Sequence, residues 1–143
     1  MKLRACKESD LEDIKHLLEE NKLPFDDIAE LRKNIVVAEN DKGEFIGIGA
    51  LEIYGKIGLF RSLVVAKNAR NKTYGSIIYK HVEDKGKNIG VRELYLLTEN
   101  ACKYFENLGF TEVVRDTVPV EIKNTNQFSS LCPASARIMR KYL

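Results

Sequence analysis

Hydrophobic and polar positions alternate with two different periods along the chain, and the changes of period mark its helices and strands. Apolar residues recur with helical spacing over 11–18, directly after Ser9, which with Glu12 has the sequence of a capping box. These features predict an amphipathic helix, which ends before Pro24 because proline cannot continue the helical hydrogen bonds. A second, weaker helix is expected over 25–33.

β-branched and apolar residues dominate the next part of the chain, which is typical of strands. After a first short strand at 3–6, strands are expected at 35–39, 45–54 and 57–65. Turn signals at 40–43 and 54–56 separate the last three of them. Because these connections are short, we predict an antiparallel meander.

The pattern becomes helical again at Thr73. A helix is expected over 73–87, with Gly90 past its end and one face formed by Tyr74, Ile77, Ile78, His81 and Val82. Then follow a strand at 93–97, a helix at 101–108, a strand at 110–115, an irregular stretch at 116–133 with a helical turn near Glu121, and a last strand at 136–143.

The predicted order is β-α-α-β-β-β-α-β-α-β-β, which indicates an α/β fold with a mixed sheet in a single domain over 1–143. The strand–helix–strand unit places 57–65 and 93–97 side by side and parallel, with a right-handed crossover. Where such neighbouring strands diverge at their carboxyl ends, a crevice opens that suits a ligand.

Composition narrows the classes of protein that the chain can represent. The charged side chains comprise 23 basic and 21 acidic residues, for a net charge of +2, so no basic field favours nucleic acid as a partner. No apolar run approaches the roughly 18 residues of a membrane span, and no signal-peptide pattern follows Met1, so we expect a cytoplasmic protein that does not bind membranes. The cysteines Cys6, Cys102 and Cys132 lack metal-ligand spacing, so no metal is expected.

The segment 63–76 carries the clearest chemical signal. A strand ends, a polar loop with Arg70 and Lys72 follows, and a helix begins. A helix N-terminus exposes amide donors and a partial positive charge, so it is suited to phosphate groups. The same pattern also fits an ordinary strand-to-helix turn with an exposed basic loop, and the segment alone leaves both readings open.

The segment 70–75 resembles motif A of the GNAT superfamily of acetyltransferases, R/Q-x-x-G-x-G/A, in which Arg70 and Gly75 match and Thr73 replaces the first glycine. The stretch 101–110 is similar to the second signature of that family, A-x-x-x-Y-E-x-x-G-F. More narrowly, 59–63, 94–98 and 127–136 resemble amino-acid-type N-acetyltransferases encoded near arsenic-resistance genes.

The resemblance implies a GNAT fold and an enzyme of the acyltransferase class that moves an acetyl group from acetyl-CoA to a small, amino-acid-like amine. A non-catalytic acyl-CoA-binding sensor is the alternative, and pairing of the exposed late strands between subunits suggests a possible homodimer. The resemblance assigns the pantetheine arm to the main chain of 63–65 and the diphosphate to 70–76. The expected cofactor-binding residues are Leu63, Val64, Val65, Arg70, Asn71, Lys72, Thr73, Tyr74, Gly75 and Ser76.

Candidates for proton transfer and acceptor binding are fewer. Glu52 is the candidate general base, with Glu39 or Asp26 acting through water as other candidates and an exposed strand carboxylate as the alternative reading of Glu52. The family's acid tyrosine aligns with Phe105, so either the adjacent Tyr104 takes this role or the role is vacant and water protonates the thiolate. Arg61 is expected either to hold an acceptor carboxylate or to form a surface ion pair. Walls of the acceptor pocket are expected from Phe25 and Asp26.

Overall fold

The computed structural model describes residues 1–143 except 24, 71–72, 126–127 and 129–135. Its strands are β1 (Lys2–Ala5), β2 (Ile35–Glu39), β3 (Phe45–Tyr54), β4 (Ile57–Val65), β5 (Glu93–Thr98), β6 (Thr111–Val113) and β7 (Arg137–Tyr142). Its α-helices are α1 (Leu11–Glu20), α2 (Tyr74–Asn88), α3 (Cys102–Asn107) and α4 (Val120–Lys123). Short 3-10 helices are η1 (Glu8–Asp10), η2 (Ile28–Asn34), η3 (Lys67–Ala69) and η4 (Arg115–Thr117).

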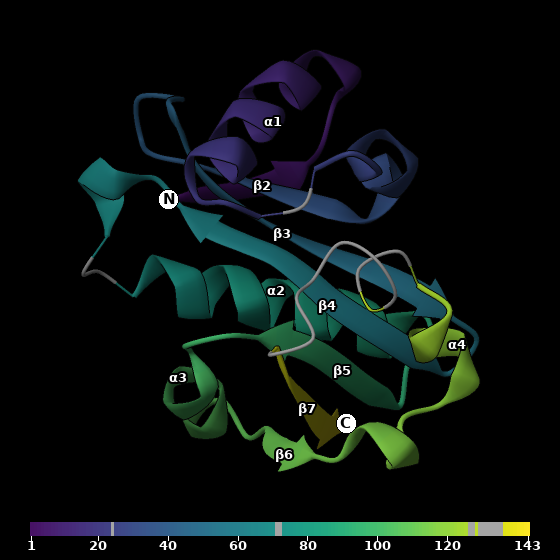
Figure 1. Cartoon of the computed structure of the whole chain (residues 1–143). Helices are drawn as coiled ribbons and strands as arrows, with labels where there is room; N and C mark the ends of the chain where they lie inside the picture. The colour runs from purple at the N-terminus through teal and green to yellow at the C-terminus, as the bar shows by residue number, and fades with distance from the viewer. Residues whose placement is uncertain (24, 71–72, 126–127, 129–135) are drawn as a thin grey trace.

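The strands form one seven-stranded sheet in the order β1-β2-β3-β4-β5-β7-β6, which confirms the predicted mixed α/β fold (Figure 1). β1 to β4 pair antiparallel, as the short turns predict. Gly43 and Gly55 lie in these turns with φ of +79° and +65°, a backbone conformation that favours glycine. The expected parallel pair is β4 with β5, joined through α2, and β7 runs antiparallel between β5 and β6.

Helices cover both faces of the sheet, and the period-2 alternation of β2 shows which helix covers which face. Ile35 and Val37 pack with α1 and η2, in a cluster that includes Ile14 and Ile28. Val36, between them, points to the opposite face and belongs to the cluster of α2. The sheet therefore carries a separate hydrophobic layer on each side.

The inward face of α2 differs from the predicted one by about one residue along the helix. Ile77 is 42% exposed and His81 is also exposed, whereas Tyr79 and Glu83 are buried. Gly86 brings the helix close to the sheet, since a Cβ atom there would lie 3.2 Å from the Leu51 side chain. This close approach and the packing of Tyr79 set the helix rotation, which hydrophobic spacing alone did not resolve.

The predicted capping box at Ser9 is wrong. Ser9 lies inside η1, and the carboxylate of Asp10 instead accepts a hydrogen bond of 2.7 Å from the backbone amide of Lys7. Arg4 donates to both oxygens of the same carboxylate, at 2.8 and 2.9 Å. This bidentate pair ties β1 to the start of α1, so the residue that orients the helix is the neighbour of the expected one.

Candidate active site

A cleft of about 650 Å³ opens where β4 and β5 part. The two strands share only three residue pairs, from Ile57↔Glu93 to Leu59↔Tyr95. Beyond Leu59 the β5-facing edge of β4 forms one wall of the cleft. The other walls are the end of β5, the loop from β5 to α3, α3 itself and the residues that follow α1. This is the crevice that the parallel pair predicts.

A β-bulge in β4 shapes this wall. The pairing with β3 runs from Ala50↔Arg61 to Ile48↔Val64. Between these two pairs β4 advances by three residues and β3 by two, so β4 contains one extra residue. Ser62 lies in the bulge with a φ of +61°, a left-handed conformation that is uncommon for a residue other than glycine. All three residues of the predicted pantetheine site, Leu63, Val64 and Val65, line the cleft.

The bulge also exchanges the faces on which the following side chains lie. Leu63 and Val65 pack with the clusters of α2, whereas Val64 packs with the cluster of α1. In a regular strand, Leu63 would share the face of Arg61, which lies two residues before it. The extra residue therefore shifts the alternation of inward and outward side chains by one position, and it does so in the part of β4 that lines the cleft.

The predicted diphosphate loop is described only in part, because Asn71 and Lys72 lie outside the described residues. Thr73 flanks the start of α2 with a φ of −77°, so the residue in place of the family's first glycine carries no left-handed strain. Gly75 lies in the first turn, where a Cβ atom would be 3.0 Å from the Tyr104 hydroxyl. The helix N-terminus is thus closely approached by α3, and Tyr74 is half-buried beside it.

Arg70 and Tyr104 each connect two sides of the cleft. Arg70 donates from Nε to the Val65 carbonyl at 3.0 Å and from Nη2 to the Asn21 side chain at 2.5 Å. Tyr104 lines the cleft and its hydroxyl lies 3.0 Å from the Ser76 hydroxyl at the start of α2. Phe105, at the aligned position of the family tyrosine, is buried against Phe60, Tyr104 and Phe110.

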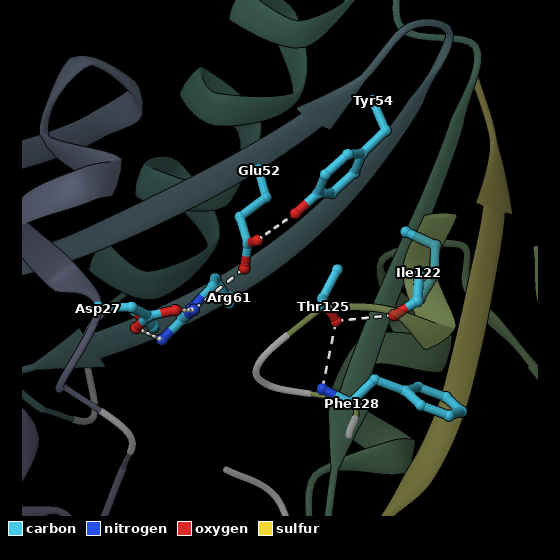
Figure 2. Close-up of polar contacts among 8 residues, drawn as sticks. Asp27, Glu52, Tyr54, Arg61, Ile122, Thr125 and Phe128 are labelled. Carbon is cyan, nitrogen blue, oxygen red and sulfur yellow. Dashed lines mark hydrogen bonds and ion pairs between the residues drawn. The ribbon is translucent and has the colours of Figure 1, made fainter. Parts of the chain in front are cut away.

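A buried ion-pair cluster surrounds Arg61, which itself lines the cleft (Figure 2). Arg61 donates to both carboxylate oxygens of Asp27, at 2.6 and 2.9 Å, and to Glu52 at 3.0 Å. Its Nε also donates to the Ser62 hydroxyl at 3.2 Å. Tyr54 donates a short hydrogen bond to the other oxygen of Glu52. We call these four residues, Asp27, Glu52, Tyr54 and Arg61, the β3–β4 ion cluster.

Burial and charge act in opposite directions inside the β3–β4 ion cluster. Burial lowers the pKa of Arg61, but its hydrogen bonds to Asp27 and Glu52 outweigh burial and raise that pKa above its ordinary value. Burial and the bond to Glu52 both raise the pKa of Tyr54, which keeps its hydroxyl protonated. Arg61 is 2% exposed, so the expected surface ion pair is instead a buried one.

The residues expected as acceptor walls fall elsewhere. Asp26 is exposed, and Phe25 packs against the α1 cluster. The carboxylate that pairs with Arg61 is the next one, Asp27, and sequence alone could not choose between adjacent aspartates. Tyr54, by contrast, lies two residues after Glu52 on the same strand, so period-2 alternation was a usable signal for it.

In the part of the chain that the structure describes, no helix is both long and apolar enough to cross a membrane. Nor do three or more His, Cys, Asp or Glu side chains gather there in an arrangement suited to a metal ion.

Comparison with known proteins identifies the family. A model of the acetyltransferase (GNAT) family matches residues 4–110. The chain belongs to the GNAT family. Among curated proteins, an uncharacterized N-acetyltransferase of Chlorobaculum tepidum is 31% identical to this GNAT chain over 102 residues, which is 71% of the chain and 64% of that protein. An amino-acid acetyltransferase of Serratia proteamaculans is 32% identical over 66 residues. That match covers 46% of the chain but only 15% of the Serratia protein.

Solved structures show the same fold. The N-acetylglutamate synthase of Neisseria gonorrhoeae, complexed with coenzyme A and N-acetyl-glutamate, aligns with a TM-score of 0.85 at 22% identity. The alignment covers 99% of this GNAT chain and 35% of the synthase chain. Rv2747 of Mycobacterium tuberculosis, in complex with CoA, aligns with a TM-score of 0.85 at 20% identity over 100% of this chain and 99% of its own. The link to arsenic-resistance genes stays a prediction.

Proposed function

We propose that this GNAT chain transfers the acetyl group of acetyl-CoA to the amine of a small, amino-acid-like acceptor. The observation that carries the proposal is the cleft, which combines an unshared strand edge, a helix N-terminus close by and a buried cluster of ionisable groups. Relatives named amino-acid acetyltransferase and a structural neighbour that carries coenzyme A with N-acetyl-glutamate support it.

The residues present fit acetyl-CoA as cosubstrate. The cleft is about 650 Å³, within the range of ligand pockets. Its wall at 63–65 offers main chain that none of the strands in the described residues pairs with on the β5 side. We assign this main chain to the pantetheine arm and the start of α2, at Gly75 and Ser76, to the diphosphate. Arg70 supplies a positive charge at the end of the cleft near Asn21 and Val65, the two residues to which its guanidinium donates.

The reaction joins the amine nitrogen to the acetyl carbonyl carbon and breaks the carbon–sulfur bond, so the enzyme must position both partners and move one proton. A backbone amide of the bulged strand is suited to polarise the carbonyl oxygen. We assign Glu52 as the base that takes the ammonium proton, because it is buried beside the cleft wall with Arg61 and Tyr54 fixing its orientation. The Tyr104 hydroxyl lines the cleft and is available to protonate the leaving thiolate.

The test is titration calorimetry with acetyl-CoA, followed by detection of free thiol with a panel of small amines. We expect a dissociation constant between about 1 μM and 1 mM, the usual range for enzyme substrates, and thiol release that at least one amine accelerates. Binding without release by any amine would favour the non-catalytic acyl-CoA-binding module. Absence of binding would contradict both functions.

Gly75→Val is expected to weaken acetyl-CoA binding at least about tenfold. This loss of binding free energy is comparable to that of one charge-assisted hydrogen bond. Already the Cβ atom would lie 3.0 Å from the Tyr104 hydroxyl, so bulk there narrows the approach to the start of α2. His81→Val places the same side chain at an exposed position of α2 and controls for helix propensity. Calorimetry of both variants decides, and equal affinities would remove Gly75 from the site.

A further inference from the structure

The charged residues that line the cleft are Lys22, Arg61, Arg70 and Glu99. Lys22 and Arg70 lie with Asn21 at the end where the Arg70 guanidinium bonds to α1 and to the last carbonyl of β4. The β3–β4 ion cluster lies at Arg61 and Ser62, which line the cleft on the other side of the bulge. The basic end suits the phosphates of the cosubstrate, which leaves the ion cluster to the acceptor.

Arg61 is the basic residue of that cluster, and the protein itself occupies most of its donors. A guanidinium carries five N–H groups, and four of those of Arg61 donate to Asp27, Glu52 and Ser62. One N–H on Nη2 remains, which is too few for a bidentate grip on a substrate carboxylate. The cluster holds two carboxylates against one guanidinium, so its formal charge is −1.

Phe128 packs against the cluster of Leu59 and Tyr95, to which Tyr54 also packs, on the same face of the sheet as the ion cluster (Figure 2). From 124 to 136 the sequence contains no lysine, arginine, aspartate or glutamate. Within the ion cluster, the charge that faces the acceptor is that of Asp27, Glu52 and Arg61 together.

We propose that Asp27 is a specificity-determining residue, which neutralises Arg61 and so makes the acceptor side electronegative. This inference rests on the proposed function and deepens it: the acceptor is an amino-acid-like amine without a second carboxylate, with a neutral or cationic side chain. An ammonium group is attracted to this side, and a second carboxylate is repelled. N-acetyl-glutamate, the ligand of the structural neighbour, is a dicarboxylate and belongs to the disfavoured class.

The chain offers a matched pair of variants for the test. Asp27→Asn removes one negative charge from the cluster and frees donors of Arg61. Asp26→Asn removes the same charge from the adjacent, exposed position. For each protein, kcat/KM is measured with amide and acid partners of equal size: glutamine with glutamate, asparagine with aspartate, and the amide and acid analogues of the best acceptor in the amine panel.

We expect the wild-type protein to prefer the amide partner by about tenfold or more, as one partly screened unit charge predicts. Asp27→Asn should reduce that preference by about tenfold, with the KM for acetyl-CoA unchanged, whereas Asp26→Asn should leave the preference as it is. A purely structural role of Asp27 would slow all acceptors alike and leave the ratio unchanged, which would overturn the inference. A dicarboxylate as the best acceptor would also overturn it.

Two further measurements keep the test decisive. Should Asp27→Asn fail to fold, the affinities for the amide and acid partners are compared by titration calorimetry in Glu52→Gln, which removes the other negative charge and whose binding of acceptors does not require the base. A preference for the amide as large as that of the wild-type protein counts against the inference. Absence of thiol release with every amine would refute the proposed function itself. Release with amines but without any preference between amide and acid would refute only the inference about the acceptor.

Discussion

Replacement of Arg61 by leucine is expected to lower the free energy of unfolding by about 3–5 kcal/mol, the usual loss when one partner of a buried ion pair is removed. The side chain of Arg61 is 0% exposed, and those of its partners Asp27 and Glu52 are 8% and 10% exposed. Leucine leaves two buried carboxylates close together with no positive charge between them. Urea denaturation at pH 7 measures the effect, together with a melting temperature lower by roughly 10 °C.

Two comparisons show whether the effect comes from buried charge. Arg32→Leu removes an arginine that is 43% exposed and 3.9 Å from its partner, so it should cost less than about 1 kcal/mol. Adding Asp27→Asn and Glu52→Gln to Arg61→Leu removes the uncompensated carboxylates and should recover part of the loss. A loss in Arg61→Leu no larger than in Arg32→Leu would mean that the cluster contributes little to stability.

Glu83 is expected to make stability depend on pH in the acidic range. It is 1% exposed, and it accepts hydrogen bonds from Tyr79, Lys80 and Lys141 at 2.7, 2.8 and 2.5 Å. Burial raises the pKa of Glu83, but these three bonds outweigh it and lower the pKa from 4.5 to about 2. The unfolded chain therefore takes up the proton first as the pH falls, and the folded state loses stability between pH 4.5 and pH 2.

The contribution of Glu83 above pH 4.5 is about 3 kcal/mol, from the size of the pKa shift. Glu83→Gln should thus be destabilised by about that amount at pH 7 and should approach the wild-type protein near pH 2. Asp84→Asn, at the next position of α2 and 55% exposed, serves as the control, with little change at either pH. Urea unfolding across pH 2–7 measures both, and a parallel pH profile for Glu83→Gln and wild type would contradict the assignment.

The element order could be predicted from sequence because it depends on local signals. Turn sequences at Gly43 and Gly55 define the hairpins, and helical spacing separates α2 from the strands around it. The parallel pair of β4 and β5 then follows from the right-handed crossover rule. Glu52 and Arg61 also stood out as site candidates, because charged residues inside apolar strands are conspicuous, and their roles stay predictions.

What could not be predicted depends on contacts between distant parts of the chain. Asp27 meets Arg61 across 34 positions, and Lys141 meets Glu83 across 58. No local pattern distinguishes Asp27 from Asp26. Nor does any local pattern show that Glu83, unlike the other charged residues of α2, is buried. Asp27 and Glu52 both pair with Arg61 only because the fold brings them together. The net charge of the acceptor side could therefore not be predicted from the sequence.

The bulge at Ser62 has a consequence for how this chain tolerates changes in length. Deleting Ser62 would return β4 to regular pairing with β3, because Leu63 would then follow Arg61 directly and lie on the opposite face from it, as it already does. Leu63 and Val65 would stay in the layer of α2, and Val64 would stay in that of α1. A one-residue deletion at the bulge would therefore keep both hydrophobic layers and shorten only the wall of the cleft, whereas a deletion in the regularly paired part of β4, such as that of Leu59, would exchange the faces of the side chains beyond it.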